Sequence, residues 1–326
     1  MSHTDPAPAR KTSRVGLYGP FVLAGIVIIV WSAGWLWARG EAERRVDQAA
    51  ARWRAAGGEL SWARRDVHGY PFRLDVDFTD LRVSDPSGWG LATPTLKTEM
   101  AVFAGDRLMI VVPNGASVTR PRSGTVRITA RVLRASLAGW DRQPPRISIE
   151  GMDLTFAPFP GAKPLPITEA REFQFHTRAG PNDQGEFALQ LIQAKARPDD
   201  LLGRISDGGR IDLDADMVFS HASRVRGGGW PAAVRAWSQA GGALTVQRVR
   251  AQAAGAVFES RAGTLGVQPD GHVAGSLTAT LSQAAASPPP ANAPAPQPRG
   301  PRVTLAFTAG KMSLDGVVLD SAPRVF

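Results

Sequence analysis

The chain has 326 residues, of which 43% are hydrophobic and 21% charged, and it contains no cysteine. This composition is ordinary for a globular protein with enough apolar residues to bury a core. The lack of cysteine excludes disulfides, thiolate nucleophiles and thiolate metal ligands. The net charge of +9 is spread along the chain, which indicates a solvated surface that suits an anionic membrane rather than one dense basic block.

The first predicted element is a membrane-spanning helix over residues 17–37, which contain no charged side chain. A helix of this length rises about 31 Å, which matches the hydrocarbon core of a bilayer. Trp31, Trp35 and Trp37 crowd one end of the run, as aromatic residues do at a membrane interface. A cleaved signal peptide is the alternative, but its apolar core is shorter and is followed by a small-residue cleavage site. We therefore favour an uncleaved anchor.

The orientation of the anchor is predicted from its flanks. The basic tail over residues 1–16 includes Arg10, Lys11 and Arg14, which favours a cytoplasmic amino terminus, although Arg39 follows the span closely. A long carboxy-terminal domain is translocated largely regardless of its charge. We therefore expect a single-pass protein of the inner membrane with residues 38–326 in the periplasm.

The exported part is predicted to be α+β and rich in β-strands. Residues 41–56 have the composition of an amphipathic helix that ends at Gly57-Gly58. From there apolar and polar residues alternate in many short runs, of which Leu74–Phe78 and Val126–Val132 are examples. Turn residues separate these runs, among them Pro113-Asn114-Gly115. The pattern predicts an extended antiparallel sheet.

A weak internal repeat relates residues 52–64 to residues 236–248. Each segment has a Trp four residues before a Gly-Gly pair, followed by a Leu and an Arg at matching positions. The repeat predicts a second amphipathic helix and two similar helix-plus-sheet units, over about 41–225 and 230–326. Coincidence in a chain rich in Ala, Gly and Arg is the alternative. Residues 285–301 are rich in Pro and Ala, which predicts a disordered loop.

The order of these features resembles a known family. The anchor is followed by a helix ending in Gly-Gly, by Val67-His68-Gly69-Tyr70-Pro71-Phe72-Arg73, by a turn containing Trp89, and by late Asp-Gly hairpins. This arrangement is similar to that of the bacterial domain-of-unknown-function 2125 family. More loosely, the hairpins resemble those of AsmA-type envelope proteins, whose curved sheets imply a link to lipid handling. The resemblance implies a membrane-anchored envelope protein and assigns no catalytic residue.

The polar residues form no recognisable catalytic pattern. The five histidines lack the spacing of metal ligands, and the sequence has no phosphate-binding loop and no nucleophile elbow. We therefore expect a protein that is not an enzyme and that has no catalytic residue, no metal and no cofactor. Nucleic-acid binding is not expected, because several of the Trp residues belong to the anchor and the helices.

The expected function is that of a binding module of the cell envelope that contacts lipid or lipid-linked glycan through an apolar face of the sheet. The candidate binding residues are His68, Tyr70, Phe72 and Trp89, which lie in the two turns of the resemblance. The expected partners are the bilayer, through residues 17–37, and a lipid or an envelope protein. The alternative is a structural or assembly protein that binds another envelope protein.

Overall fold

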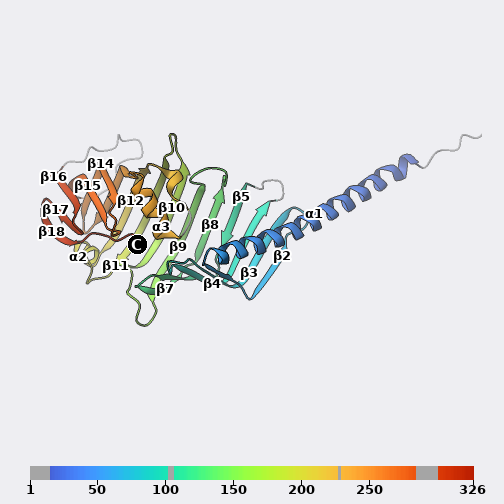
Figure 1. Cartoon of the computed structure of the whole chain (residues 1–326), viewed down its shortest axis with the longest axis horizontal. Coiled ribbons are helices and arrows are strands. Elements are labelled where there is room, and N and C mark those ends of the chain that lie inside the picture. The colour runs from blue at the N-terminus through green and yellow to red at the C-terminus, as the bar shows by residue number, and fades with distance from the viewer. Residues whose placement is uncertain (1–14, 102–105, 227–228, 284–299) are drawn as a thin grey trace, which may run out of the picture.

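The computed structural model describes residues 15–101, 106–226, 229–283 and 300–326. It contains one long helix, one large sheet and two short helices (Figure 1). The helices are α1 (Val15–Ala55), α2 (Leu201–Ser206) and α3 (Trp230–Gln239), with a 3-10 turn η1 (Ala222–Arg224). The strands are β1 (Glu59–Ser61), β2 (Arg64–His68), β3 (Arg73–Ser84), β4 (Gly90–Ala101), β5 (Arg107–Val111), β6 (Ala116–Arg120), β7 (Gly124–Thr129), β8 (Val132–Ala138), β9 (Arg146–Pro158), β10 (Ile167–Ala179), β11 (Gly185–Ala196), β12 (Arg210–Phe219), β13 (Leu244–Ala253), β14 (Ala256–Val267), β15 (Val273–Gln283), β16 (Arg302–Thr308), β17 (Lys311–Leu314) and β18 (Val317–Ser321).

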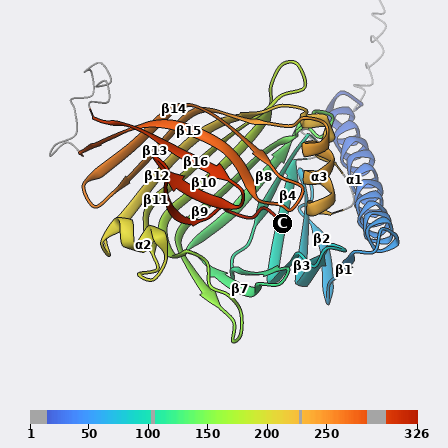
Figure 2. The same ribbon diagram turned by 60° about the vertical axis from the view of Figure 1, so that its left-hand side comes forward.

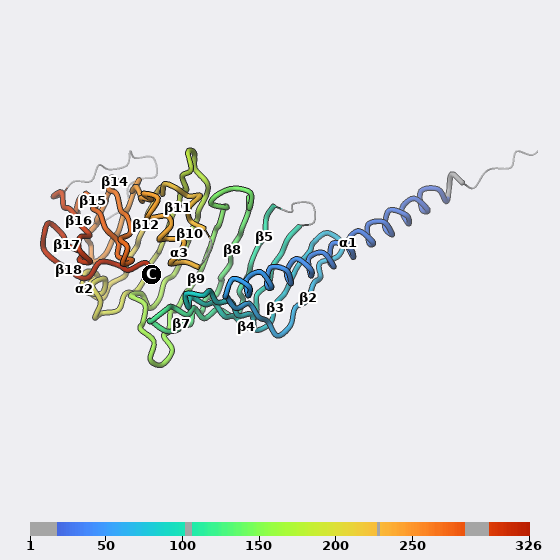
Figure 3. The backbone as a smooth tube through the Cα atoms, viewed as in Figure 1, coloured from blue at the N-terminus to red at the C-terminus, as the bar shows by residue number. Residues whose placement is uncertain are grey.

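Helix α1 joins the predicted anchor and the predicted amphipathic helix into one continuous element of 41 residues. Three residues, Ala38, Arg39 and Gly40, lie between the two predicted segments, and the i, i+4 ion pair between Arg39 and Glu43 spans the junction. Its amino-terminal part extends beyond the sheet, as the backbone trace in Figure 3 shows. The helix ends where predicted: Gly57 adopts a φ of 84°, and the Gly58 N–H donates to the carbonyl of Trp53.

The 18 strands form one antiparallel sheet that is almost entirely a meander. From β9 to β18, each strand pairs with the next one in the chain. In the amino-terminal part, two short strands share one long neighbour in three places: β1 and β2 on β3, β5 and β6 on β4, and β7 and β8 on β9. The predicted β-rich α+β class and the antiparallel sheet are confirmed.

One predicted turn and one predicted strand differ from the structure, and both lie in the same region of the sheet. Pro113-Asn114-Gly115 does not reverse the chain, because β5 and β6 on either side of it both pair with β4. The alternating run Val126–Val132 is likewise interrupted at Ala130-Arg131, where β7 ends and β8 begins. Asp80 in β3 and Asp153 in β9 adopt positive φ angles of 51° and 52° near these breaks. Because a left-handed residue re-aims a strand, these positions bend the sheet along one line.

The two faces of the sheet differ in polarity throughout. On one face the register places apolar side chains of successive strands beside one another, for example Val76 on β3, Ile149 on β9 and Leu189 on β11. We call this the apolar face. The other face carries polar and charged residues, including Asp214 opposite Arg250. The alternation of apolar and polar residues in the sequence therefore corresponds to the two faces of the sheet.

The apolar face is covered at both ends of the sheet. Near the amino terminus, Trp35, Ala42 and Val46 of α1 pack over the apolar side chains of β2 to β4. Near the carboxy terminus, the sheet curls so strongly that Ala215 of β12 and Phe307 of β16 belong to one buried cluster. Figure 2 shows this curvature, with α1 and α3 at the open side of the sheet.

The two segments of the predicted repeat have the same local geometry. In each, the indole of a helical Trp donates to a strand-end carbonyl: Trp53 to Ser84 at 2.8 Å and Trp237 to Ser220 at 2.6 Å. The second glycine of each Gly-Gly pair lies against that indole, with no room for a Cβ atom. The division of the chain into two units stays a prediction. The predicted loop over 285–301 and the tail over 1–16 lie almost wholly outside the described residues.

Candidate functional site

The β2–β3 turn, residues Gly69–Phe72, lies against the anchor helix. The Trp31 indole donates to the carbonyl of Pro71 at 2.9 Å, and the Trp35 indole donates to the carbonyl of Arg73 at 2.9 Å. The hydroxyl groups of Ser32 and Tyr70 are 2.9 Å apart. Three consecutive polar contacts therefore fix the turn to one face of α1.

Aromatic rings reinforce the same contact. The rings of Trp35 and Tyr70 meet edge to face with centroids 5.5 Å apart, and those of Trp31 and Phe72 are 6.5 Å apart. Trp35 is 7% exposed, whereas Tyr70 is 51% and Phe72 is 63% exposed. The turn thus uses one side of its aromatic residues to bind the helix and presents the other side outward.

His68 belongs to a different surface from Tyr70 and Phe72. Its side chain is on the polar face, with Nε2 3.4 Å from Asp77 and Nδ1 3.9 Å from Asp75. Asp75 is buried and also receives a bond of 2.6 Å from Arg73. Because every charge of this group has an opposite partner, the cluster resembles a satisfied ion-pair network more than a vacant binding site.

Trp89 lies at the opposite end of β3 from the other three predicted residues. It closes the β3–β4 turn, where the Asp85 carboxylate accepts bonds from the Ser87 hydroxyl and from the N–H groups of Ser87 and Trp89. The second oxygen of Asp85 accepts from the Trp230 N–H at the start of α3, at 3.2 Å. The structure therefore does not bring Trp89 together with His68, Tyr70 and Phe72.

Asp85 links distant parts of the chain. Burial raises its pKa, but the hydrogen bonds from Ser87, Trp230 and Trp89 outweigh burial and hold the pKa below its usual value. The Trp230 indole in turn donates to the carbonyl of Val325 at 2.9 Å. The carboxylate thus caps the first N–H of α3 from the β3–β4 turn, and α3 ties this turn to the carboxy-terminal tail.

Part of the apolar face in the middle of the sheet is only partly covered, beside a third buried cluster formed by Leu154, Ala170, Leu191 and Ala194. Leu137, Ile147, Ile149 and Phe175 lie on this face of β8, β9 and β10 and are half-buried. They fall between the buried cluster under α1 and the cluster of the curled carboxy-terminal strands. Apolar surface that keeps partial access to solvent on a curved sheet is suited to bind acyl chains or an apolar partner segment.

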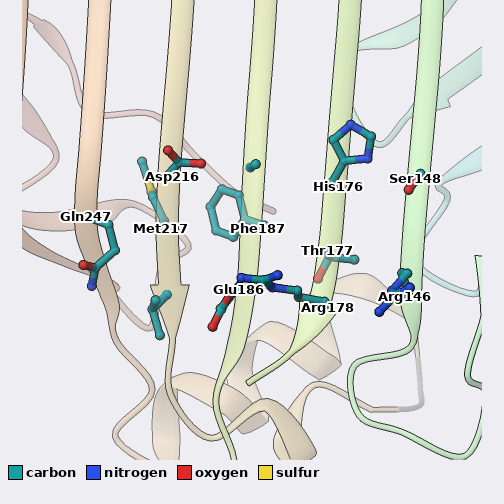
Figure 4. A pocket seen from close by; sticks show the side chains of 12 residues that line it. Arg146, Ser148, His176, Thr177, Arg178, Glu186, Phe187, Asp216, Met217 and Gln247 are labelled. Carbon is teal, nitrogen blue, oxygen red and sulfur yellow. Dashed lines mark hydrogen bonds and ion pairs between the residues drawn. The ribbon is translucent and has the colours of Figure 1, made fainter. Parts of the chain in front are cut away.

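A depression lies on the polar face of the sheet. It has a volume of about 810 Å³ and crosses the strands from β9 to β13. Figure 4 shows Ser148 and His176 on the adjacent strands β9 and β10, and Asp216 on β12, with β11 between His176 and Asp216. Arg178 and Glu186 within it form an ion pair of 2.6 Å. Across the described ranges, no group of three or more acidic, His or Cys side chains is arranged to hold a metal ion.

The partners of the β2–β3 turn on α1 are not predicted from the sequence. Trp31 and Trp35 were interpreted only as interfacial residues of the span, although residues four apart lie on one face of a helix and can form a platform. Asp85 was not singled out at all. Its signal was the Asp-Pro-Ser-Gly-Trp order over residues 85–89, which is typical of a turn closed by an Asp side chain.

Of the comparisons with known proteins, the one with family models gives a match. No curated protein and no solved structure matches the chain. A family model described as an uncharacterized protein conserved in bacteria, DUF2125, matches residues 35–320. This match covers the end of the anchor and nearly the whole sheet, including both turns described above. The chain therefore belongs to the DUF2125 family of bacterial proteins.

Proposed function

We propose that this protein is a membrane-anchored module of the bacterial cell envelope that binds lipid, or lipid-linked glycan, on the apolar face of its sheet. The observation that supports this proposal most directly is that the apolar face runs without interruption along the sheet. It begins under the same helix that is long and apolar enough to cross a membrane, and it extends strand by strand to the distal end of the sheet.

The anchor is supported by the free part of α1. Large apolar side chains between Tyr18 and Val30 are more than half exposed, which is the state expected of a helix that lipid surrounds. A signal sequence would have the same composition. The contacts of Trp31 and Trp35 with the β2–β3 turn favour retention of the helix, because cleavage beyond Trp37 would leave the turn without its platform.

Lipid is favoured over a small polar ligand by the chemistry of the half-covered region. Leu137, Ile147, Ile149 and Phe175 offer apolar surface and no charge. The sheet is also long enough to lead away from a bilayer: neighbouring strands are about 4.8 Å apart, so β9 lies about 20 Å beyond β3 along the sheet. A binding role rather than catalysis is part of the proposal.

Site-specific photo-cross-linking in native membranes tests the proposal. A photoreactive amino acid replaces Ile149 on the apolar face, and the matched control replaces Ser148, the adjacent residue on the polar face of β9. We expect phospholipid adducts at position 149 and none at position 148. Equal labelling at both positions, or no lipid adduct at 149, would contradict lipid binding on this face.

An assembly role is the second candidate, and the edge of the sheet favours it. Within the described part of the chain, β18 pairs with β17 on one side and with no strand on the other. Its Val317 and Val318 are 66% and 57% exposed, which is typical of an edge that accepts a further strand. A photoreactive residue at position 317 that cross-links to another protein, while position 149 yields no lipid, would favour this function.

The periplasmic location is proposed from the basic residues before the span and the length of the domain after it. A reporter that is active only in the periplasm, fused after Phe326, should be active. Activity of a cytoplasm-dependent reporter at the same position would reverse the orientation. That result would leave membrane anchoring intact.

A further inference from the structure

We propose that the β2–β3 turn, Gly69–Phe72, is a second membrane-contact site that inserts its aromatic residues into the bilayer interface beside the anchor. This inference rests on the membrane anchoring in the proposed function and adds a residue-level site to it. The occupant is the phospholipid bilayer itself, at the leaflet from which the sheet emerges.

The turn is held at a defined height on the helix. The contacts with Trp31, Ser32 and Trp35 join it to α1 within the apolar run 17–37, before the first charged residue, Arg39. Because these contacts come from two successive helical turns, the β2–β3 turn cannot slide along the helix without breaking all of them. The depth of the helix in the membrane therefore sets the depth of the turn.

The length of the helix places that height inside the membrane. From Val15 to Val30, the part of α1 before the turn contacts rises about 24 Å, which falls short of a hydrocarbon core of about 30 Å. Extending the span to Trp37 gives about 34 Å, which is sufficient. The layer from Trp31 to Trp37 must then lie in the outer part of the bilayer, and the turn lies in the same layer.

The chemistry of the turn fits this environment. Gly69, Tyr70, Pro71 and Phe72 carry no charge, and the two aromatic rings are more than half exposed. Leu36 and Trp37 on the helix are exposed in the same way, so the layer contains aromatic and apolar side chains from two elements. Such a combination is typical of the aromatic belt at a membrane interface, where amphipathic rings are favoured.

The charged neighbour of the turn does not oppose insertion. Arg73 follows Phe72 directly, but its guanidinium lies 2.6 Å from Asp75 and 3.2 Å from Glu99 on the polar face. Its backbone carbonyl accepts a hydrogen bond from Trp35, which lies one helical turn closer to Arg39 than Trp31 does. Pro71 and Phe72, which both contact Trp31, are therefore the deepest residues of the turn.

The absence of cysteine allows a direct measurement of depth in the full chain. We propose the single variant Phe72→Cys, labelled with an environment-sensitive fluorophore and reconstituted into vesicles of phosphatidylethanolamine and phosphatidylglycerol. The matched control is Val317→Cys, which is 66% exposed on the distal strand β18. Quenching by spin-labelled lipid should be several-fold stronger at position 72 than at 317, and quenching by iodide several-fold weaker.

A second variant keeps the test decisive. In the variant Tyr70→Cys the label replaces a side chain that contacts both Ser32 and Trp35, so lipid probes of the same interfacial depth should quench it as they quench position 72. Labels at both positions that iodide reaches as freely as at 317 would overturn the inference. Flotation of the vesicles separates the two proposals: protein that does not float refutes the anchor, whereas floating protein with water-exposed labels refutes only the second contact site.

Discussion

The Asp85 carboxylate offers a sharp test of how the curved sheet is closed. It accepts hydrogen bonds from the β3–β4 turn and from the first N–H of α3, which is 145 residues away in sequence. We expect Asp85→Ala to loosen both elements at once. The β3–β4 turn would lose its internal acceptor, and α3 would lose its amino-terminal cap.

The magnitude follows from the bonds that are lost. Removing a cap costs about 1 kcal/mol, and leaving the turn N–H groups without their carboxylate costs about a further 1 kcal/mol. A total of about 2 kcal/mol lowers the melting temperature of a domain of this size by about 4 °C. The same energy accelerates amide exchange by local opening about 30-fold, since about 1.4 kcal/mol corresponds to a factor of ten.

Hydrogen exchange measured on the full chain in detergent micelles checks this expectation. The amides of Ser87, Trp89 and Trp230 should exchange faster in Asp85→Ala, while amides of the distal hairpin β17–β18 should not change. Asp199→Ala is the matched control, because its side chain is 89% exposed and lies 3.9 Å from Arg197. Faster exchange at the turn with an unchanged α3 would refute the link between the two elements.

The same carboxylate predicts a pH dependence with a defined sign. Its folded-state pKa is lower than normal, so its stabilising contribution is complete above the unfolded pKa of about 3.9. The contribution is lost as the pH falls through the lower folded pKa. The difference in melting temperature between the native chain and Asp85→Asn should therefore be constant from pH 7 to about pH 5 and should shrink below about pH 4. A difference that grows in acid would contradict this assignment.

Further predictions concern the helix ends and the turn platform. Gly242→Ala places a Cβ 2.3 Å from the buried indole of Trp237, and we expect a loss of about 1–3 kcal/mol in thermal or denaturant unfolding. Gly58→Ala places a Cβ 2.3 Å from the Trp53 indole and 2.8 Å from the backbone carbonyl of Ser84, which cannot move aside, so we expect a loss of similar size; unchanged stability would contradict the packing argument. Trp35→Phe removes the indole donor but keeps an aromatic ring, and it should cost about 1 kcal/mol and raise exchange in the β2–β3 turn; an unchanged turn would show that the bond does not hold it.

The sequence predicted the fold class well because the signals involved are local. Alternation of apolar and polar residues reports the two faces of a sheet directly, and Gly57-Gly58 reports a helix end. The bend of the sheet was not predictable in this way. Asp80 adopts a left-handed conformation, which an Asp residue can adopt but does not require. The pairing of β3 with its neighbouring strands selects this conformation.

The candidate site was only partly predictable. Tyr70 and Phe72 were singled out by their turn, and both contact the anchor helix. Trp89 belongs to the same family-like pattern, but the 12-residue strand β3 separates it from them. Residues of one sequence motif that lie on either side of a long strand end up at opposite ends of that strand. Membership of the same motif therefore does not place Trp89 in one site with Tyr70 and Phe72.

The two linkages described here act on the same surface. The turn contacts at Trp31 and Trp35 hold the amino-terminal strands against the anchor, and Asp85 with Trp230 holds α3 across the curved sheet. The two linkages start from opposite ends of β3, whereas the half-covered part of the apolar face lies on β8 to β10. Weakening either linkage would therefore loosen the helix that it holds and expose the apolar side chains packed beneath that helix, without opening the strands of the sheet itself.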